Sequence, residues 1–369
     1  MKENKQLIQK EPMFHVAKRD GISTAKAWKV RILSFLLSLV VGGIMIVIIT
    51  KLNPIEVYEG IISGAIGSKR RIWVTHRDTM LLLLVAIAIT PAFKMRFWNI
   101  GAEGQILVGG VATAAMMIYL GGVLPGWLLI VLMLVSSVLA GAIWGFIPAI
   151  FKAKWNTNET LFTLMLNYVA MQITTMCIIL WENPAGSNSV GIINSDSQAG
   201  WIRSIGSLTY GWIVLIVLAV TLFMYIYLKY TKHGYEIAVV GESENTARYA
   251  GINVKKVTLR TMALSGAIAG LAGFLIVSGS SRTISTSTAN GRGFTAIIVS
   301  WLAKFKPGAM IFISFLLIFL EKGAIQIASQ FNLNENLADV LTSIILFFIL
   351  GSEFFLNYEV KFRKRKEAK

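Results

Sequence analysis

The chain alternates between long apolar segments and shorter polar ones, and this alternation is its dominant pattern. A helix needs about 20 apolar residues to cross a bilayer, so the longer apolar runs predict membrane-spanning helices and the shorter ones predict short or broken spans. The pattern therefore predicts an all-α polytopic membrane protein with about ten membrane passes. The runs lie at 32–50, 79–93, 106–120, 127–151, 159–180, 212–228, 257–278, 294–303, 308–320 and 337–350.

Composition and charge agree with a membrane protein. Hydrophobic residues make up 55% of the 369 residues and charged residues only 15%, which is too apolar for an ordinary soluble domain. The formal net charge is +16, but the Lys and Arg residues lie in the tails and short connections, so it gives no reason to expect a nucleic-acid partner. In the predicted topology 26 of the 35 Lys and Arg residues lie on the side of both termini and 9 on the other side, which predicts cytoplasmic N and C termini.

The polar intervals divide the chain into a central membrane domain with two tails. A basic tail covers residues 1–29, the membrane domain covers 30–352, and a second basic tail covers 353–369. Within the membrane domain, the polar interval 182–211 is predicted to be an external loop. The interval 229–257 is predicted to be a cytoplasmic loop.

Two pairs of glycines have a spacing that favours close helix packing. Gly141 and Gly145 lie in one predicted span, and Gly266 and Gly270 lie in another. Small residues four positions apart share one helix face and let two membrane helices approach closely. We therefore expect both stripes to lie at helix–helix contacts.

The segment 98–105 is the first candidate for function. It places Asn99, Glu103 and Gln105 at the mouth of the apolar run 106–120. A carboxylate at membrane depth is costly unless protein or water surrounds it, which makes Glu103 a candidate for lining a substrate path. The alternative is structural: Glu103 lies in the first turn of a helix for which Asn99 supplies the N-cap, and the two roles are compatible.

Two further side chains are candidates for the same path. Trp98 is the first residue of that segment, and Asn167 lies on a polar stripe within the run 159–180. Their assignment rests on the placement of polar and aromatic groups among apolar residues. We expect the five side chains together to line a weakly binding path.

A short helix is predicted inside the interval 229–257. Ser243 suits its N-cap, Glu244 its first turn and Gly251 its C-terminal stop. The alternative interpretation is a solvated loop. A helix at this place is a plausible contact for a cytoplasmic partner.

No motif predicts that the chain catalyses a reaction. It contains no Gly-x-x-x-x-Gly-Lys-Ser/Thr loop for ATP phosphates, and its three histidines lie in different polar segments with Cys177 the single cysteine. Only Glu103, Glu159 and, near an outer end, Asp339 are predicted to place a carboxylate at membrane level. The sequence predicts no cofactor and no metal, and any ATP-driven step has to come from a partner subunit.

Three ordered motifs resemble the permease subunits of bacterial ABC importers. They are Asn99–Gln105, the stretch 158–168, and the stretch 240–252 followed by Ser265-Gly266-Ala267. More narrowly, the chain resembles the branched-chain amino acid and ribose-type permease family, in its nucleoside and simple-sugar branch, over about residues 30–352. It departs from the pattern at Asn245-Thr246-Ala247, where such importers often have Glu-Ala-Ala, and in the basic patch 69–71.

The resemblance implies a function and a set of partners. It implies a multi-pass subunit of the plasma membrane that moves a neutral polar solute, with nucleosides favoured over simple sugars as the cargo. A channel or a polytopic membrane enzyme is the weaker alternative. The expected partners are a separate ATPase, a substrate-binding lipoprotein and a second permease, with a different homologous chain favoured over a second copy. The residues implied to contact the ATPase are Gly241, Glu242, Glu244, Ala247, Arg248 and Gly251.

Overall fold

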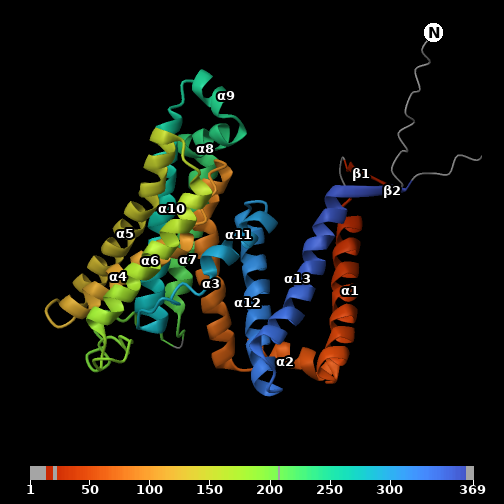
Figure 1. Cartoon of the computed structure of the whole chain (residues 1–369), viewed down its shortest axis with the longest axis horizontal. Coiled ribbons are helices and arrows are strands. Elements are labelled where there is room, and N and C mark those ends of the chain that lie inside the picture. The colour runs from red at the N-terminus through yellow and green to blue at the C-terminus, as the bar shows by residue number, and fades with distance from the viewer. Residues whose placement is uncertain (1–13, 20–22, 207, 363–369) are drawn as a thin grey trace, which may run out of the picture. The chain divides into compact units, whose positions relative to one another are not determined.

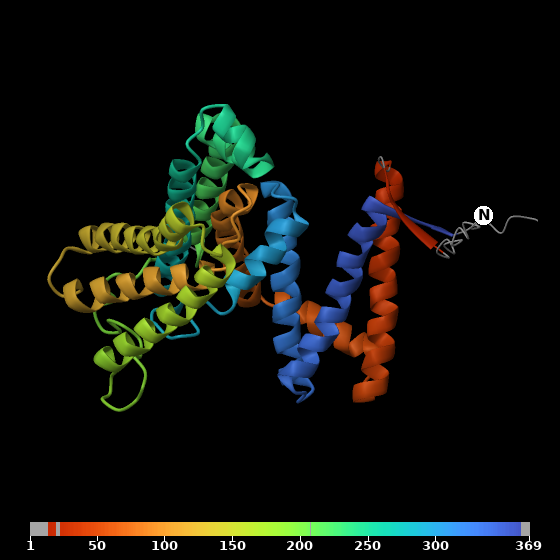
Figure 2. The same cartoon turned by 45° about the horizontal axis from the view of Figure 1, so that its top comes forward.

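The computed structural model describes residues 14–19, 23–206 and 208–362, and the described chain is mainly helical. It divides into two compact units, seen in two views in Figures 1 and 2. The first unit, residues 1–65 and 320–369, holds β1 (Phe14–Lys18), α1 (Thr24–Thr50), α2 (Pro54–Ile66), α13 (Glu335–Asn357) and β2 (Tyr358–Phe362). The second unit, residues 66–319, holds α3 (Lys69–Lys94), α4 (Ala102–Leu120), α5 (Gly126–Trp155), α6 (Glu159–Trp181), α7 (Gly211–Tyr230), α8 (Lys232–Glu242), α9 (Glu244–Tyr249), α10 (Val254–Ile276) with the π-helical segment Val277–Ser281, and α11 (Arg292–Leu302). Helix α12 (Pro307–Gln330) begins in the second unit and continues into the first.

The prediction of an all-α polytopic membrane protein is confirmed. Within the described residues, eight helices are long and apolar enough to cross a membrane: α1, α3, α4, α5, α6, α7, α10 with its π-helical extension, and α12. Each of the ten predicted runs coincides with one of these helices or with α11 or α13. Two of the runs predicted to be short are not, because α12 and α13 have 24 and 23 residues.

Helix α3 begins ten residues before the predicted span at 79–93. Ser68 caps it by accepting a hydrogen bond from the Arg71 backbone N–H at 3.3 Å, so the basic patch 69–71 forms its first turn rather than part of a loop. The helix also runs through Pro91 to Lys94. A proline this close to the helix end removes only one backbone hydrogen bond.

The two predicted glycine stripes pack against each other, on α5 and α10. A methyl group added at Gly145 would lie 2.6 Å from the carbonyl oxygen of Met262, and one at Gly266 would overlap the backbone of Gly141. Helix α4 joins this contact, since a methyl group at Gly109 would lie 2.5 Å from the Cα atom of Gly270. Backbones this close leave no room for a side chain, so the prediction of close helix packing is confirmed.

Helix α11 is a half-length element preceded by a long irregular segment. Its 11 residues rise about 16 Å, roughly half the apolar thickness of a bilayer. The preceding segment starts at Arg282, whose carbonyl accepts from the Ile193 N–H at 2.9 Å and whose guanidinium lies 3.9 Å over the Trp201 ring. Asn194 of the same 182–210 loop donates to the Met117 carbonyl near the C-terminal end of α4 at 2.8 Å. The loop from Arg282 to Gly291 therefore leads from this region to the start of α4, where Gly291 contacts Glu103, and α11 then packs mainly against α3.

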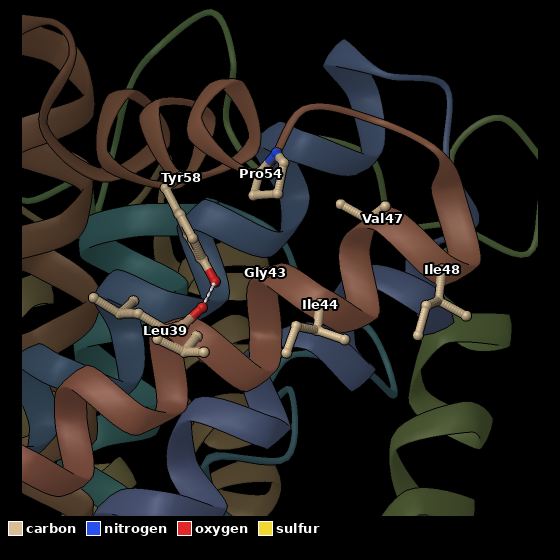
Figure 3. Close-up of a pocket in the computed structure, with 8 residues that line it drawn as sticks. Leu39, Gly43, Ile44, Val47, Ile48, Pro54 and Tyr58 are labelled. Atoms are coloured by element: carbon tan, nitrogen blue, oxygen red, sulfur yellow. Dashed lines mark hydrogen bonds between the residues drawn. The ribbon is translucent and has the colours of Figure 1, made fainter.

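In the first unit, α1 packs against α13, most closely at the end near the strands, where Arg31 and Glu353 form an ion pair of 2.9 Å. The α2 helix returns against α1, where the Tyr58 hydroxyl donates to the Leu39 carbonyl at 2.6 Å. Figure 3 shows an apolar pocket of about 430 Å³ beside this hydrogen bond. The pocket is lined by Leu39, Val40, Gly43, Ile44, Val47, Ile48, Pro54 and Tyr58.

Candidate functional site

The irregular segment that links α3 to α4 is held by buried amide side chains. Asn99 is fully buried; its Nδ2 donates to Ser265 Oγ on α10 at 3.2 Å, and its Oδ1 accepts from the Gly101 N–H at 3.0 Å. Gln105, 1% exposed, lies within 3.4 Å of the same amide through both of its terminal atoms. Both amides therefore satisfy one another and the backbone inside the protein.

Helix α6 supplies the other side of this network. Asn167 is 3% exposed; its Nδ2 donates to the Ile100 carbonyl at 2.9 Å and its Oδ1 accepts from the Gly104 N–H at 2.9 Å. Thr163, one turn earlier, accepts from the Ile100 N–H at 3.2 Å. The predicted polar stripe of α6 thus satisfies the backbone groups that the non-helical segment leaves unpaired.

Glu103 binds the start of α11. Its two carboxylate oxygens accept from the backbone N–H groups of Gly291 and Gly293, each at 2.7 Å. A methyl group at Gly293 would lie 2.8 Å from Glu103 Oε2, so glycine leaves the space that this contact needs. The carboxylate lies where the unpaired N–H groups and the positive end of the α11 dipole favour an anion.

Asn99 is not the N-cap of α4, so that prediction is wrong. Gly101 occupies the N-cap position and makes no side-chain capping bond. The Asn99 oxygen accepts from the Gly101 N–H, within the segment that precedes the helix. Glu103 does lie in the first turn of α4, but its hydrogen bonds go to a different helix.

A second set of charges fixes the same end of α11. Asp78 on α3 is 1% exposed and lies 2.8 Å from Arg77 Nε and 3.4 Å from Arg292 Nη2. Arg77 also donates to the Tyr210 hydroxyl at 3.2 Å. Sequence reasoning placed these residues in external polar segments and did not find the network. The one available signal was Arg292, which lies between two glycines directly before the apolar run 294–303.

The aromatic residues near the other end of α11 are accessible. The Trp98 and Trp301 rings stack with centroids 5.5 Å apart at 23°, and the Phe93 ring lies edge-on to both. Trp98 is 44% exposed and Trp301 is 46% exposed in the single chain. Of the five predicted path residues, only Trp98 presents a large accessible surface. Phe294 and Ile298 continue the exposed face along α11.

The predicted cytoplasmic interval folds into two helices, α8 and α9, rather than one. Ser243 separates them and caps α9 by accepting from the Thr246 N–H at 3.3 Å, as predicted for a cap at this residue. The helix ends at Tyr249, and Gly251 follows with a φ of +75°, which agrees with its predicted role as a stop. Sequence reasoning missed α8, whose N-cap is Thr231.

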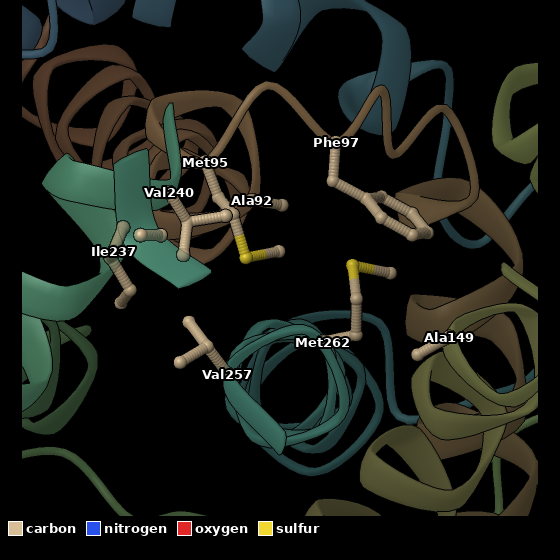
Figure 4. Close-up of a cluster of buried hydrophobic side chains, with 9 residues drawn as sticks. Ala92, Met95, Phe97, Ala149, Ile237, Val240, Val257 and Met262 are labelled. Atoms are coloured by element: carbon tan, nitrogen blue, oxygen red, sulfur yellow. The ribbon is translucent and has the colours of Figure 1, made fainter. Parts of the chain in front are cut away.

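This α8–α9 hairpin (residues 232–251) is packed against the ends of α3 and α10. Figure 4 shows Ile237 and Val240 of α8 beside Met95 and Val257, while Ala149 of α5 completes the cluster on its far side, near Met262. A methyl group at Gly241 would overlap the Lys94 carbonyl oxygen, so α8 lies directly on the end of α3. The cluster consists of Ala92, Met95, Phe97, Ala149, Ile237, Val240, Ala247, Val257 and Met262.

The outer face of the α8–α9 hairpin is polar and accessible. Glu244 and Arg248 form an exposed ion pair at 3.3 Å, and Tyr249 is 93% exposed. On α8, Glu236 accepts from Arg260 Nη2 at 2.8 Å, and this hydrogen bond lowers the pKa of Glu236 below its ordinary value. A cleft of about 460 Å³ beside the hairpin includes Gly241, Glu242, Glu244 and Arg248 in its lining.

Comparison with known proteins relates the chain to transport permeases. Residues 74–350 match the family described as "Branched-chain amino acid transport system / permease component". The nucleoside ABC transporter permease protein NupB of Lactococcus lactis is 30% identical over 333 residues, which cover 86% of this chain and 90% of NupB. The guanosine ABC transporter permease protein NupP of Bacillus subtilis is 28% identical, with 86% and 92% covered. The glucose ABC transporter permease protein TsgB13 of Haloferax volcanii is 27% identical, with 92% of each chain covered.

Proposed function

Since this chain belongs to the permease-component family of branched-chain amino acid transport systems, we propose that it is the membrane subunit through which an ABC importer carries nucleosides. Members of the family are integral membrane permease components, and ATP is hydrolysed by a separate subunit. The chain is accordingly a multi-pass membrane protein and not an enzyme. The nucleoside cargo is supported by the similarity to NupB and NupP.

The observation that carries the choice of cargo is the accessible Trp98–Trp301 stack. A nucleobase binds to an aromatic face by stacking, which is worth about 1–3 kcal/mol per base where measured in nucleic-acid complexes. Two stacked rings present such a face without a buried charge. This chemistry suits a neutral, aromatic cargo that has to be bound weakly and released.

In this proposal the five predicted path residues have two different roles. Trp98 contacts the cargo, while Asn99, Gln105 and Asn167 hold the segment that carries it. Glu103 fixes α11, which carries Trp301. The polar atoms of the buried side chains are already paired within the protein. These residues therefore hold Trp98 and α11 in place and do not contact the cargo themselves.

The proposed contact with the ATPase is the outer face of the α8–α9 hairpin. Arg248 and Glu244 offer exposed charges there, and Glu242 and Gly251 flank the short helix α9. Gly241 and Ala247 pack against the membrane helices. A displacement of α9 is therefore transmitted through the buried cluster to α3, α5 and α10. We place a binding lipoprotein and a second, homologous permease as the other partners, with a heterodimer favoured.

A sugar importer is the second candidate function. It is favoured by the similarity to the glucose permease protein TsgB13, and aromatic faces also bind the apolar faces of sugars. Because both kinds of cargo bind to aromatic faces, substitutions of the Trp98–Trp301 stack do not separate the two functions, whereas a comparison of guanosine uptake with glucose uptake does.

The experiment measures initial uptake of radiolabelled guanosine in cells that express this chain with its ATPase, partner permease and lipoprotein. Trp98→Ala and Trp301→Ala should each lower uptake about tenfold, which corresponds to the loss of about 1.4 kcal/mol of stacking. Trp127→Ala is the matched control, because Trp127 is 71% exposed on α5, away from the stack. Normal guanosine uptake by both stack variants at equal surface expression would refute the assignment of the path.

A further inference from the structure

A cavity of about 580 Å³ lies between α8 and the start of α10. The polar side chains of this α8–α10 cavity are Lys232, His233 and Glu236 from α8 and Lys256 and Arg260 from α10, and the turn 250–253 completes its lining. None of its lining residues also lines the cleft beside α9 described above. Of the residues proposed to contact the ATPase, the cavity includes only Gly251.

The charges of the α8–α10 cavity are not balanced. Glu236 and Arg260 join its two walls by an ion pair of 2.8 Å. Lys232 lies one turn before Glu236 and Lys256 lies one turn before Arg260, so each lysine shares a helix face with one partner of this pair. Within the described part of the chain, neither lysine forms an ion pair. The lining thus contains three basic side chains against one carboxylate.

Two lysines without an ion pair on facing walls of one cavity form a binding site for an anion. Lysine binds phosphate groups as a compact point charge. The cavity also lies where two helices begin, since α8 starts at Lys232 and α10 starts at Val254. The positive ends of both helix dipoles add to the charge of the lysines. The chemistry of the cavity therefore fits a phosphate group.

The α8–α10 cavity lies at the ends of two membrane helices. The span of α7 ends at Tyr230, two residues before α8, and the span of α10 begins at Val254. The Nζ atom of Lys229 lies 5.2 Å from the centroids of both the Tyr225 and the Tyr230 rings. Tyrosine and lysine gather at the level of the lipid headgroups. The last turn of α7 therefore marks the membrane surface beside the cavity.

An aromatic surface leads from the membrane segment of α7 to the α8–α10 cavity. The rings of Phe223 and Tyr227 stack with centroids 5.9 Å apart, and the Tyr227 hydroxyl lies 3.4 Å from Nδ1 of His233 in the cavity lining. Phe223 is 53% exposed and Ile226 is 46% exposed in the single chain. A ligand with a phosphate in the cavity can therefore place apolar chains on α7.

We propose that the α8–α10 cavity binds a phosphate group, supplied by the headgroup of an anionic phospholipid whose acyl chains lie along Phe223 and Ile226. A soluble phosphate ester would make the same contacts with Lys232 and Lys256 but none with α7. The distribution of Lys and Arg along the chain assigns the lipid to the cytoplasmic leaflet. The bound phosphate bridges α8 to α10 and so holds the α8–α9 hairpin on the membrane domain. This inference is independent of the cargo.

The test measures lipid binding to the full-length protein by native mass spectrometry. Protein purified in detergent is titrated with phosphatidylglycerol, and the affinity for the first lipid is compared among wild type, Lys232→Gln, Lys256→Gln and the double variant. Lys255→Gln is the matched control, because it removes the same charge from the adjacent residue, which lines the cleft beside α9 instead. Glycerol phosphate, a headgroup without acyl chains, is the competitor. Monodisperse elution of every variant controls for folding.

Lys232→Gln and Lys256→Gln should each weaken the binding of phosphatidylglycerol about fivefold, and the double variant about 25-fold, because a basic residue near anionic lipid contributes about 1 kcal/mol. Equal weakening by Lys255→Gln, or unchanged binding by the double variant, would overturn the proposal. Displacement of the lipid by an equal concentration of glycerol phosphate would overturn the lipid source and assign the cavity to a soluble phosphate. Loss of the lipid when the ATPase binds would also overturn it and assign the two lysines to acidic groups of that subunit.

Discussion

Replacing Glu103 by glutamine removes one charge and one acceptor from the contact between α4 and α11. Each carboxylate oxygen accepts one backbone N–H at 2.7 Å, and the side chain is only 9% exposed. The amide of glutamine can accept one of these N–H groups but presents its own NH₂ to the other. A buried donor left without a partner costs about 1–3 kcal/mol, and the lost charge at a helix start adds about 0.3–1 kcal/mol.

We therefore expect Glu103→Gln to destabilise the protein by about 1–4 kcal/mol. The assay is thermal unfolding of the purified protein in detergent, followed by the fluorescence of its ten tryptophans. Glu159→Gln is the matched control, because Glu159 also lies in the first turn of a helix but pairs with Lys152 at a partly exposed site. Such a pair contributes about 0–1 kcal/mol. Equal losses of Tm in the two variants would refute the role given to Glu103.

Three other changes test separate parts of the structure. Gly266→Leu should prevent folding, because α5 backbone fills the space of its side chain, whereas Gly126→Leu, with open space around it, should elute as wild type in size-exclusion chromatography. Arg248→Glu should abolish stimulation of ATPase activity by loaded lipoprotein in the reconstituted complex, while normal stimulation would exclude α9 as the contact. The pKa of Glu236 is lowered by Arg260, so their bond stabilises the fold above the ordinary pKa of glutamate and is lost as pH falls through the lower folded value. Between about pH 6 and pH 3, Arg260→Gln should therefore lose less Tm than wild type, and parallel curves would contradict this.

The sequence predicted the order and approximate positions of the apolar helices because apolar length is a local property. It also predicted that the glycine stripes of α5 and α10 lie at helix–helix contacts, but not that the two stripes meet each other. It failed where a charge is paired across the fold. Asp78 looked like a loop residue because its partner Arg292 lies more than 200 residues away, and neither belongs to a motif.

The candidate path also combines features that local sequence patterns predict with contacts that they do not. The segment 98–105 was singled out correctly as a place where polar groups enter the membrane domain, but the identity of their partners could not be predicted. Of the five predicted path residues, Asn99, Glu103, Gln105 and Asn167 are buried, and Trp98 alone is accessible. Trp301 escaped notice because the stack depends on how α11 is placed against α3, which no local pattern encodes. The role of the path residues in transport stays a prediction.

The most direct test of the proposed function is transport by purified components. Proteoliposomes containing this chain, its partner permease and the ATPase, with the lipoprotein outside and ATP inside, are assayed for uptake of radiolabelled guanosine and glucose. We predict ATP-dependent accumulation of guanosine that disappears when this chain is left out, with no accumulation of glucose. Accumulation of glucose alone, or guanosine uptake that is equal without ATP, would contradict the proposed function.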